Sequence, residues 1–345
     1  MLTVLLFGVA LWAFATLLGA PLRLRMALIL GLWMVVVLIN LTLPTGTPLR
    51  TATGGDARAW LVLAAAVAVI WAYRFGLRHL RTRAQTTGAE PEQPSPLFSE
   101  TELARYARHM MLREVGGPGQ KRLKQAKVLV IGAGGLGSPA LLYLAAAGVG
   151  TIGVIDDDSV EGSNLQRQII HTDARIGTPK VHSAALQMQA LNPFITVRPY
   201  HRRLTESEAP TLFADYDLIL DGTDNFDTRY LANRIAVSLK KPLISAAITQ
   251  WEGQISLYEP ANGGPCYACI FPERPAEGLA PSCAEAGVIA PLPGVLGSMM
   301  ALEAVKYLTQ AGEPLRGALL IYDGLYGETR KITTKQRPDC PICGT

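Results

Sequence analysis

The stretch Lys127-Val-Leu-Val-Ile131-Gly132-Ala-Gly-Gly-Leu-Gly137 decides the fold of the larger part of this 345-residue chain. Its first five residues form a short apolar run rich in β-branched side chains, which is typical of a buried strand. The glycines allow a tight turn and let backbone amides approach an anion closely, and a helix-like stretch follows at 138–147. The amino-terminal end of such a helix favours a phosphate, so the order of strand, glycine turn and helix predicts a nucleotide site. A glycine turn without a ligand is the alternative.

The residues after this turn predict the fold class. A second strand is expected at 151–155, and it leads into Asp156-Asp-Asp158, where Asp156 can accept hydrogen bonds from ribose hydroxyls. Further strands are expected at 195–199, 218–220, 243–246, 255–258 and 319–322. Helical stretches separate the early strands, which predicts an α/β domain with a Rossmann-like, doubly wound, mostly parallel sheet.

Composition divides the chain into two unlike parts. Residues 1–80 hold one acid, Asp56, no lysine and six arginines, whereas the whole chain is 49% hydrophobic and 17% charged. This excludes a disordered chain and argues against an ordinary soluble protein. The net charge of +4, with 28 acids interspersed, excludes the single-sign field of a nucleic-acid binder.

Three apolar runs, at 2–20, 26–43 and 59–77, predict three transmembrane helices. No basic residue precedes the first run, so a cleaved signal peptide fits poorly. Arg23 and Arg25 lie in the 21–25 connection, and Arg74, Arg78, Arg81 and Arg83 lie at the end of the third run and after it. This places the amino terminus outside and everything after Tyr73 in the cytoplasm, as in a multi-pass protein of the inner membrane. No Asp, Glu, Lys or His lies inside the runs, which favours an anchor over a transporter. The expected organisation is a membrane anchor at 1–83, a linker at 84–98 and a catalytic domain at 99–345.

Polar residues after the second strand favour a triphosphate over a dinucleotide. Asn164, Arg167 and Gln168 follow the ribose acid, and Lys180 stands behind a Gly-Thr-Pro turn. Asp224 follows the apolar run 218–220, so it is expected at the carboxyl end of a strand, where it could hold Mg²⁺ against phosphate oxygens. An NAD-dependent oxidoreductase would leave these residues unexplained and lacks an accompanying acid/base set.

Four of the five cysteines form two Cys-x-x-Cys pairs, Cys266 with Cys269 and Cys340 with Cys343. Four thiolates suit tetrahedral Zn²⁺, and because they leave no open ligand position the metal would be structural. A redox pair is the alternative, but neither pair stands on a thioredoxin-like strand-to-helix turn.

From Ser99 onward the chain resembles the bacterial ubiquitin-activating-enzyme-like (HesA/MoeB/ThiF) adenylyltransferases, with closest resemblance to the molybdopterin-synthase adenylyltransferase type. The matching segments are Arg105-Tyr-Ala-Arg-His109, Gly132-Ala-Gly-Gly-Leu-Gly137, Asp156-Asp-Asp158, Ser163-Asn-Leu-Gln-Arg-Gln168, Gly177-Thr-Pro-Lys180, Asp221-Gly-Thr-Asp-Asn225, the two cysteine pairs and Glu285-Ala-Gly-Val-Ile-Ala-Pro291. Residues 1–98 lie outside the family's usual pattern.

The resemblance implies an enzyme that uses ATP to adenylate the carboxyl-terminal glycine of a small ubiquitin-fold sulfur carrier, the small subunit of molybdopterin synthase, and releases pyrophosphate for molybdenum cofactor synthesis. It implies nucleotide contacts from the glycine loop, the ribose acid and the segment that follows, the residues being Gly132, Gly134, Gly135, Gly137, Asp156, Asp158, Ser163, Asn164, Leu165, Gln166, Arg167, Lys180, Asp224 and Asn225. Arg167 and Lys180 would balance phosphate charge, and Asp224 would bind Mg²⁺.

Two further residues follow from the resemblance alone. Family members are homodimers in which the arginine matching Arg108 reaches into the partner's site. Cys283 aligns with a loop cysteine that forms a covalent link to the carrier in the thiazole branch, so adenylation of the thiamine-thiazole carrier is an alternative, as is a bystander thiol. Because the chain ends after the second cysteine pair, a separate sulfur donor is expected. A non-catalytic membrane scaffold is the remaining alternative.

Overall fold

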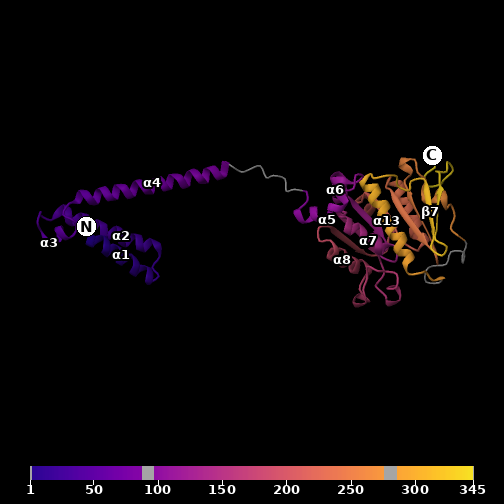
Figure 1. Cartoon of the computed structure of the whole chain (residues 1–345), viewed down its shortest axis with the longest axis horizontal. Helices are drawn as coiled ribbons and strands as arrows, with labels where there is room; N and C mark the ends of the chain where they lie inside the picture. Colours follow the sequence, from indigo (N-terminus) through magenta and orange to yellow (C-terminus); the bar gives the residue numbers. More distant parts are fainter. Residues whose placement is uncertain (1, 88–96, 276–285, 345) are drawn as a thin grey trace. The chain divides into compact units, whose positions relative to one another are not determined.

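The computed structural model describes residues 2–87, 97–275 and 286–344, without the side chains of 78 and 80–87, and the chain divides into two compact units, Met1–Ser95 and Pro96–Thr345 (Figure 1). The first unit is entirely helical. Its helices are α1 (Leu2–Leu17), α2 (Leu22–Thr42), α3 (Pro48–Ala52) and α4 (Ala57–Thr87). Helix α2 packs against α1 and α4, so the unit is a small helical assembly with α2 at its centre.

The expectation of three membrane-spanning helices is corrected to two candidates. By length and apolar composition, Leu22–Thr42 and Pro48–Leu77 can cross a membrane, whereas α1 has only 16 residues. Gly19, in the left-handed region at φ +69°, and Pro21 follow the end of α1, which explains why this helix stops short of the expected residue 20. Helix α4 continues past residue 77 to Thr87, and it therefore includes residues 84–87 of the expected linker.

A buried polar group ties the helices of this first unit together. Asn40 on α2 is almost fully buried, and its side-chain amide donates to the Val36 carbonyl at 2.8 Å and to Thr53 Oγ1 at 2.9 Å. Trp60 on α4 donates its indole N–H to the Thr53 carbonyl at 2.9 Å. Apolar surroundings strengthen such bonds, so this cluster fixes the connection between α2 and α4.

The second unit contains one sheet of eight strands in the order β3-β2-β1-β4-β5-β6-β7-β8. The strands are β1 (Lys127–Ile131), β2 (Thr151–Asp156), β3 (Thr196–His201), β4 (Leu218–Asp221), β5 (Leu243–Ile248), β6 (Glu252–Tyr258), β7 (Ala318–Asp323) and β8 (Glu328–Thr333). The first five strands in this order are parallel to their neighbours, and β6, β7 and β8 are added antiparallel. The predicted mostly parallel, doubly wound α/β fold is confirmed.

Helices cover both faces of the sheet, and strand β1 shows why. Val128 and Val130 belong to one buried core, whereas Leu129 and Ile131 belong to the other. The helices of the unit are α5 (Glu100–Met110), α6 (Gly116–Gln125), α7 (Gly137–Ala147), α8 (Lys180–Leu191), α9 (Ala209–Ala214), α10 (Phe226–Ser238), α11 (Tyr267–Ile270) and α13 (Pro291–Thr309). Helix α13 packs against α7 (Figure 1) and β5 on the first face. Helices α9 and α10 contribute to the core on the second face. A strand that is buried on both faces is a continuous apolar run, as Val128–Ile131 is.

Strand β1 lies between β2 and β4, and the chain crosses from β1 to opposite sides of the sheet. In open α/β sheets, ligands bind at such a switch point, outside the carboxyl ends of the strands. Ile131, Asp156 and Asp221 end the three neighbouring strands β1, β2 and β4 at this edge. The fold therefore brings the residues that follow these three strands to one place.

Candidate functional site

A cavity of about 780 Å³ lies at the carboxyl ends of β1, β2 and β4. Of the residues expected to bind the nucleotide, those that line it are Gly132, Gly134, Gly135, Asp156, Asp158, Asn164, Arg167, Lys180, Asp224 and Asn225. Four of the expected residues are outside its lining: Gly137, Ser163, Leu165 and Gln166. The fold thus collects most of the expected set from segments more than 90 residues apart in the sequence.

The glycine loop has a backbone that excludes side chains at two positions. Gly132 adopts φ +92°, in the left-handed region. A Cβ atom on Gly137 would lie 2.0 Å from the Gly132 carbonyl oxygen, which is far inside van der Waals contact. Gly137 therefore contributes to the site by closing the turn, although it does not line the cavity.

The carboxylate of Asp156 binds the backbone of this loop. Its Oδ2 accepts from the Ala133 amide at 2.7 Å, and its Oδ1 accepts from the Asp158 amide at 2.8 Å. Burial raises the pKa of Asp156, although the Ala133 amide favours the charged form. Asp156 is therefore a structural clamp as well as a candidate ribose acceptor.

His171 supports the glycine loop without lining the cavity, and the sequence analysis missed it. It is buried, its Nε2 lies 2.9 Å from the Ala133 carbonyl, and its Nδ1 lies 2.9 Å from Ser183 Oγ. Because a carbonyl can only accept, Nε2 carries the proton, and in the neutral ring Nδ1 accepts from the Ser183 hydroxyl. Burial lowers the pKa of His171, which keeps the ring neutral. Nothing in the sequence distinguishes this histidine from the other four.

Lys180 and Arg167 place cationic groups on the cavity wall. Lys180 begins α8 and is buried, with Nζ 2.7 Å from Asp158 Oδ2, and its backbone amide donates to the Asp158 carbonyl. Arg167 donates from Nη2 to Asn164 Oδ1 at 2.8 Å. The two side chains are thus held at the cavity by Asp158 and Asn164, which are themselves expected nucleotide contacts, and the arrangement suits a polyanionic ligand.

A buried ion pair fixes the loop that carries Asp224. Asp221 has no exposed surface, accepts from Thr223 Oγ1 at 2.7 Å and from Ser245 Oγ at 2.9 Å, and lies 3.5 Å from Arg229 Nε. Arg229, on α10, is 4% exposed and donates from Nη2 to the carbonyls of Thr223 at 2.5 Å and Ala246 at 3.0 Å. Burial disfavours the charged guanidinium, but Asp221 together with Tyr267 and Tyr258 raises the pKa of Arg229.

This loop presents Asp224 to the cavity as an exposed carboxylate. The next residue, Asn225, caps α10 by accepting from the Thr228 amide at 3.2 Å. Among the residues that the structure describes, Asp224 belongs to no preformed cluster of metal ligands. A Mg²⁺ ion at Asp224 would therefore take most of its oxygen ligands from phosphate and water, as Mg²⁺ commonly does.

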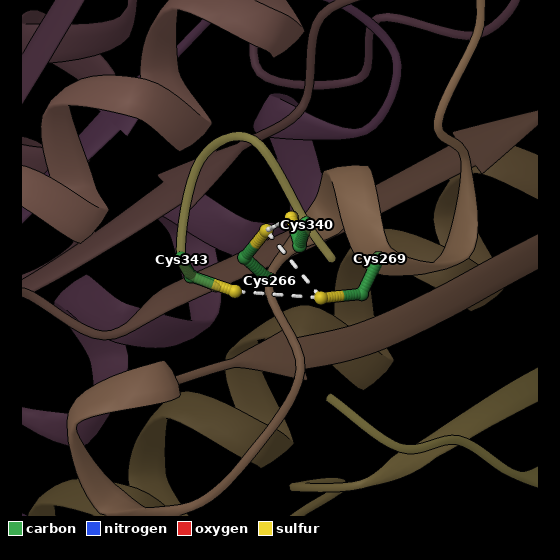
Figure 2. Close-up of side chains that lie close together, drawn as sticks. All are labelled: Cys266, Cys269, Cys340 and Cys343. Atoms are coloured by element: carbon green, nitrogen blue, oxygen red, sulfur yellow. Dashed lines mark hydrogen bonds between the residues drawn. The ribbon is translucent and has the colours of Figure 1, made fainter. Parts of the chain in front are cut away.

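The four paired cysteines converge at one point, although 74 residues separate the members of each facing pair (Figure 2). Cys266 Sγ lies 3.8 Å from Cys269 Sγ and 3.6 Å from Cys340 Sγ, and Cys269 Sγ lies 3.4 Å from Cys343 Sγ. A disulfide needs about 2.05 Å, whereas four sulfurs at about 2.3 Å from Zn²⁺ in a tetrahedron lie about 3.8 Å apart. All four sulfurs lie within 4.8 Å of one another, so the donor set fits a Zn²⁺ ion.

Two expected residues lie elsewhere. Arg108 is exposed on α5 and does not line the cavity of its own chain. Cys283 lies outside the residues that the structure describes.

Comparison with known proteins identifies the family. The ThiF family model matches residues 106–342. The sulfur carrier protein adenylyltransferase of Thermus thermophilus is 50% identical over 251 residues, which are 72% of this chain and 93% of that protein. The probable adenylyltransferase/sulfurtransferase MoeZ of Mycobacterium tuberculosis is also 50% identical, over 252 residues that are 72% of this chain and 64% of that protein.

Solved structures support the fold independently. A crystal structure of E. coli MccB superimposes with a TM-score of 0.62, at 23% identity, over 70% of this chain and 75% of that one. At this identity the likeness concerns the fold alone, and it agrees with the mostly parallel sheet described above. The motifs, the sheet and the two matched relatives lead to one conclusion: the chain belongs to the ThiF family.

Proposed function

We propose that this protein adenylates the carboxyl-terminal carboxylate of a ubiquitin-fold sulfur carrier. The observation that carries the proposal is the cavity at the switch point of the sheet, where the glycine loop, the cations of Arg167 and Lys180 and the exposed carboxylate of Asp224 meet. The two relatives that share half of their aligned residues with the chain are named as adenylyltransferases, one of them for a sulfur carrier protein.

In the proposed reaction, a carboxylate oxygen of the carrier attacks the α-phosphorus of ATP. The bond from this phosphorus to the bridging oxygen breaks, and pyrophosphate leaves with the electron pair. The residues of the chain bind and orient the reactants, and they neutralise charge that develops on the phosphate oxygens. The backbone of the glycine loop would approach the phosphates, Asp156 would accept from the ribose, and Asn164 and Asn225 would complete the nucleotide contacts. Arg167 and Lys180 would stabilise the pyrophosphate as it leaves.

Metal ions have two separate roles in this proposal. Asp224 would hold Mg²⁺ at the cavity, where the ion would neutralise phosphate charge. Cys266, Cys269, Cys340 and Cys343 would hold a Zn²⁺ ion with all four positions filled by sulfur, so that it crosslinks the end of the chain to α11. Zinc would take no part in the chemistry.

The carrier that we propose is the small subunit of molybdopterin synthase, with sulfur delivered by a separate protein. The protein would act as a homodimer, with Arg108 reaching the cavity of the partner copy. The exposure of Arg108 on α5 agrees with such a role.

For residues 1–83 we propose a membrane anchor that keeps the catalytic unit in the cytoplasm. If the chain crosses with the two candidate helices alone, the amino terminus lies on the cytoplasmic side as well, whereas the expected outside amino terminus would require α1 as a third crossing. Two helices have the length and composition for crossing a membrane, and most of their side chains are exposed apolar groups. The anchor is tested by washing membranes with carbonate, which should leave the full chain in the membrane fraction. Release of the full chain into the wash would contradict it.

The adenylation step is tested by ATP–pyrophosphate exchange with the full chain and each purified carrier. Exchange with the molybdopterin-synthase subunit supports the proposal. Exchange with only the thiazole carrier would change the assignment and make Cys283 the candidate covalent residue.

A further inference from the structure

Helix α10 runs from the nucleotide cavity to the cysteine cluster. Its cap, Asn225, and its first-turn region line the cavity, and Arg229 stands one turn along the helix. Asn233 follows four residues later, and residues four apart lie on the same face of a helix. One face of α10 therefore carries a group at each of the two sites.

Asn233 binds the backbone of the residue that follows Cys266. It is 1% exposed, and its Oδ1 accepts from the backbone amide of Tyr267 at 2.9 Å, next to Cys266. Its Nδ2 is buried without a hydrogen-bond partner, so this amide keeps a free donor beside the backbone that carries Cys266. Asn233 does not line the cavity.

Tyr267 connects the cluster with Arg229. Its ring is buried and lies 5.8 Å from the guanidinium carbon of Arg229. Tyr230 and Tyr258 pack edge-on against the same ring, with centroids at 5.2 Å and 5.6 Å, so the ring has little room to move. Arg229 in turn donates to the Thr223 carbonyl, one residue before Asp224. An unbroken set of contacts thus joins Cys266 to the loop at the cavity.

We infer that metal binding at the four cysteines and nucleotide binding at the cavity strengthen each other through Asn233, Tyr267 and Arg229. The inference rests on the proposed nucleotide site. A bound metal fixes Cys266, and with it the backbone and ring of Tyr267, so that Arg229 holds the Thr223 carbonyl in one position. Because the packed Tyr267 ring cannot move independently of Arg229, displacement of a Cys266 that no metal holds would displace the Thr223 carbonyl as well, and a bound nucleotide would oppose this displacement. Since coupling between two sites is reciprocal, the nucleotide must raise the metal affinity by the same factor.

The test measures zinc transfer from the full chain to a chromogenic chelator, with and without Mg-ATP, while calorimetry measures ATP affinity. We expect ATP to raise the apparent zinc affinity of the wild type by about tenfold, within the range usual for coupled sites. N233A should retain zinc and bind ATP, but its coupling should fall below about twofold. Gln120 offers a matched control, because it is a buried amide that donates to the Ala147 carbonyl on the other side of the unit. Q120A should keep the full coupling.

A wild type that binds ATP with no change in zinc affinity would overturn the inference while leaving the adenylation proposal intact. Coupling between zinc and ATP in a protein that supports no carrier-dependent exchange would support the inference and contradict the adenylation proposal. Should N233A fail to fold, hydrogen exchange of the wild-type full chain decides the matter. Removing zinc should then accelerate hydrogen exchange of the amides at 222–225 and leave the exchange rates at 132–137 unchanged. The same change in exchange rate in both loops would contradict the coupling.

Discussion

Replacement of Asp221 by asparagine should destabilise the ThiF unit strongly, because it removes a charge while preserving the shape of the side chain. An asparagine can still accept from Thr223 and contact Ser245, so the main loss is the counter-charge of Arg229. Both charged side chains are buried, at 0% and 4% exposure. Leaving one buried charge without its partner costs about 3–5 kcal/mol of unfolding free energy.

For a unit of this size, that loss corresponds to a decrease in Tm of roughly 6–20 °C. The assay is differential scanning calorimetry of the full chain in detergent, comparing D221N, R229M and the double variant. The double variant should be more stable than either single variant, because it buries no unpaired charge. A decrease of less than about 2 °C for D221N, or additive losses in the double variant, would refute the argument that this ion pair organises the loop.

Three further predictions follow from individual contacts. G137A should abolish ATP binding measured by calorimetry, because its Cβ would lie 2.0 Å from the Gly132 carbonyl oxygen. The control G294A should bind ATP normally, since no atom lies within 4 Å of the added Cβ. Equal ATP affinities of the two variants would contradict the role of the turn. C343S should reduce bound zinc, measured by elemental analysis, from about one equivalent to near zero; retention of a full equivalent would exclude the four-sulfur site. Burial lowers the pKa of His171 in the folded chain. The unfolded chain therefore takes up a proton near pH 6.5 that the folded chain excludes, and the unfolding free energy should decrease as the pH falls below about 6.5. H171Q should weaken this pH dependence in denaturant titrations, and an unchanged slope would show that His171 does not cause it.

The sequence predicted the parallel core of the sheet because those strands have a local signature. Strand β1 is buried on both faces, which requires the apolar run that is visible in the sequence. Strand β8 was not expected, because all six of its residues are exposed and polar side chains dominate Glu328–Thr333. Its position depends on hydrogen bonds to β7 rather than on burial, and such pairing leaves no pattern of hydrophobicity.

The same distinction applies to the site. Glycines, the acid after β2 and the cysteine pairs were recognisable because their chemistry requires fixed residue types at fixed spacings. Arg229 and His171 were missed because an isolated arginine in a helix or a histidine in a loop is ordinarily exposed. Their burial depends on partners, Asp221 and Ser183, that only the folded chain brings into contact.

The helical region shows where composition alone is insufficient. The apolar run at 2–20 was expected to span a membrane, yet α1 ends at Leu17, because Gly19 and Pro21 interrupt it. Apolar content predicted α1, α2 and α4, whereas helix-breaking residues determined where α1 ends.

Carrier-dependent ATP–pyrophosphate exchange tests the central claim most directly. With purified full-length protein, Mg²⁺ and the small subunit of molybdopterin synthase, we expect exchange that requires the terminal glycine of the carrier and is lost on replacement of Lys180 or Asp224. A zinc-containing, folded protein that binds ATP but supports no exchange with this carrier or with the thiazole carrier would contradict the proposed adenylation.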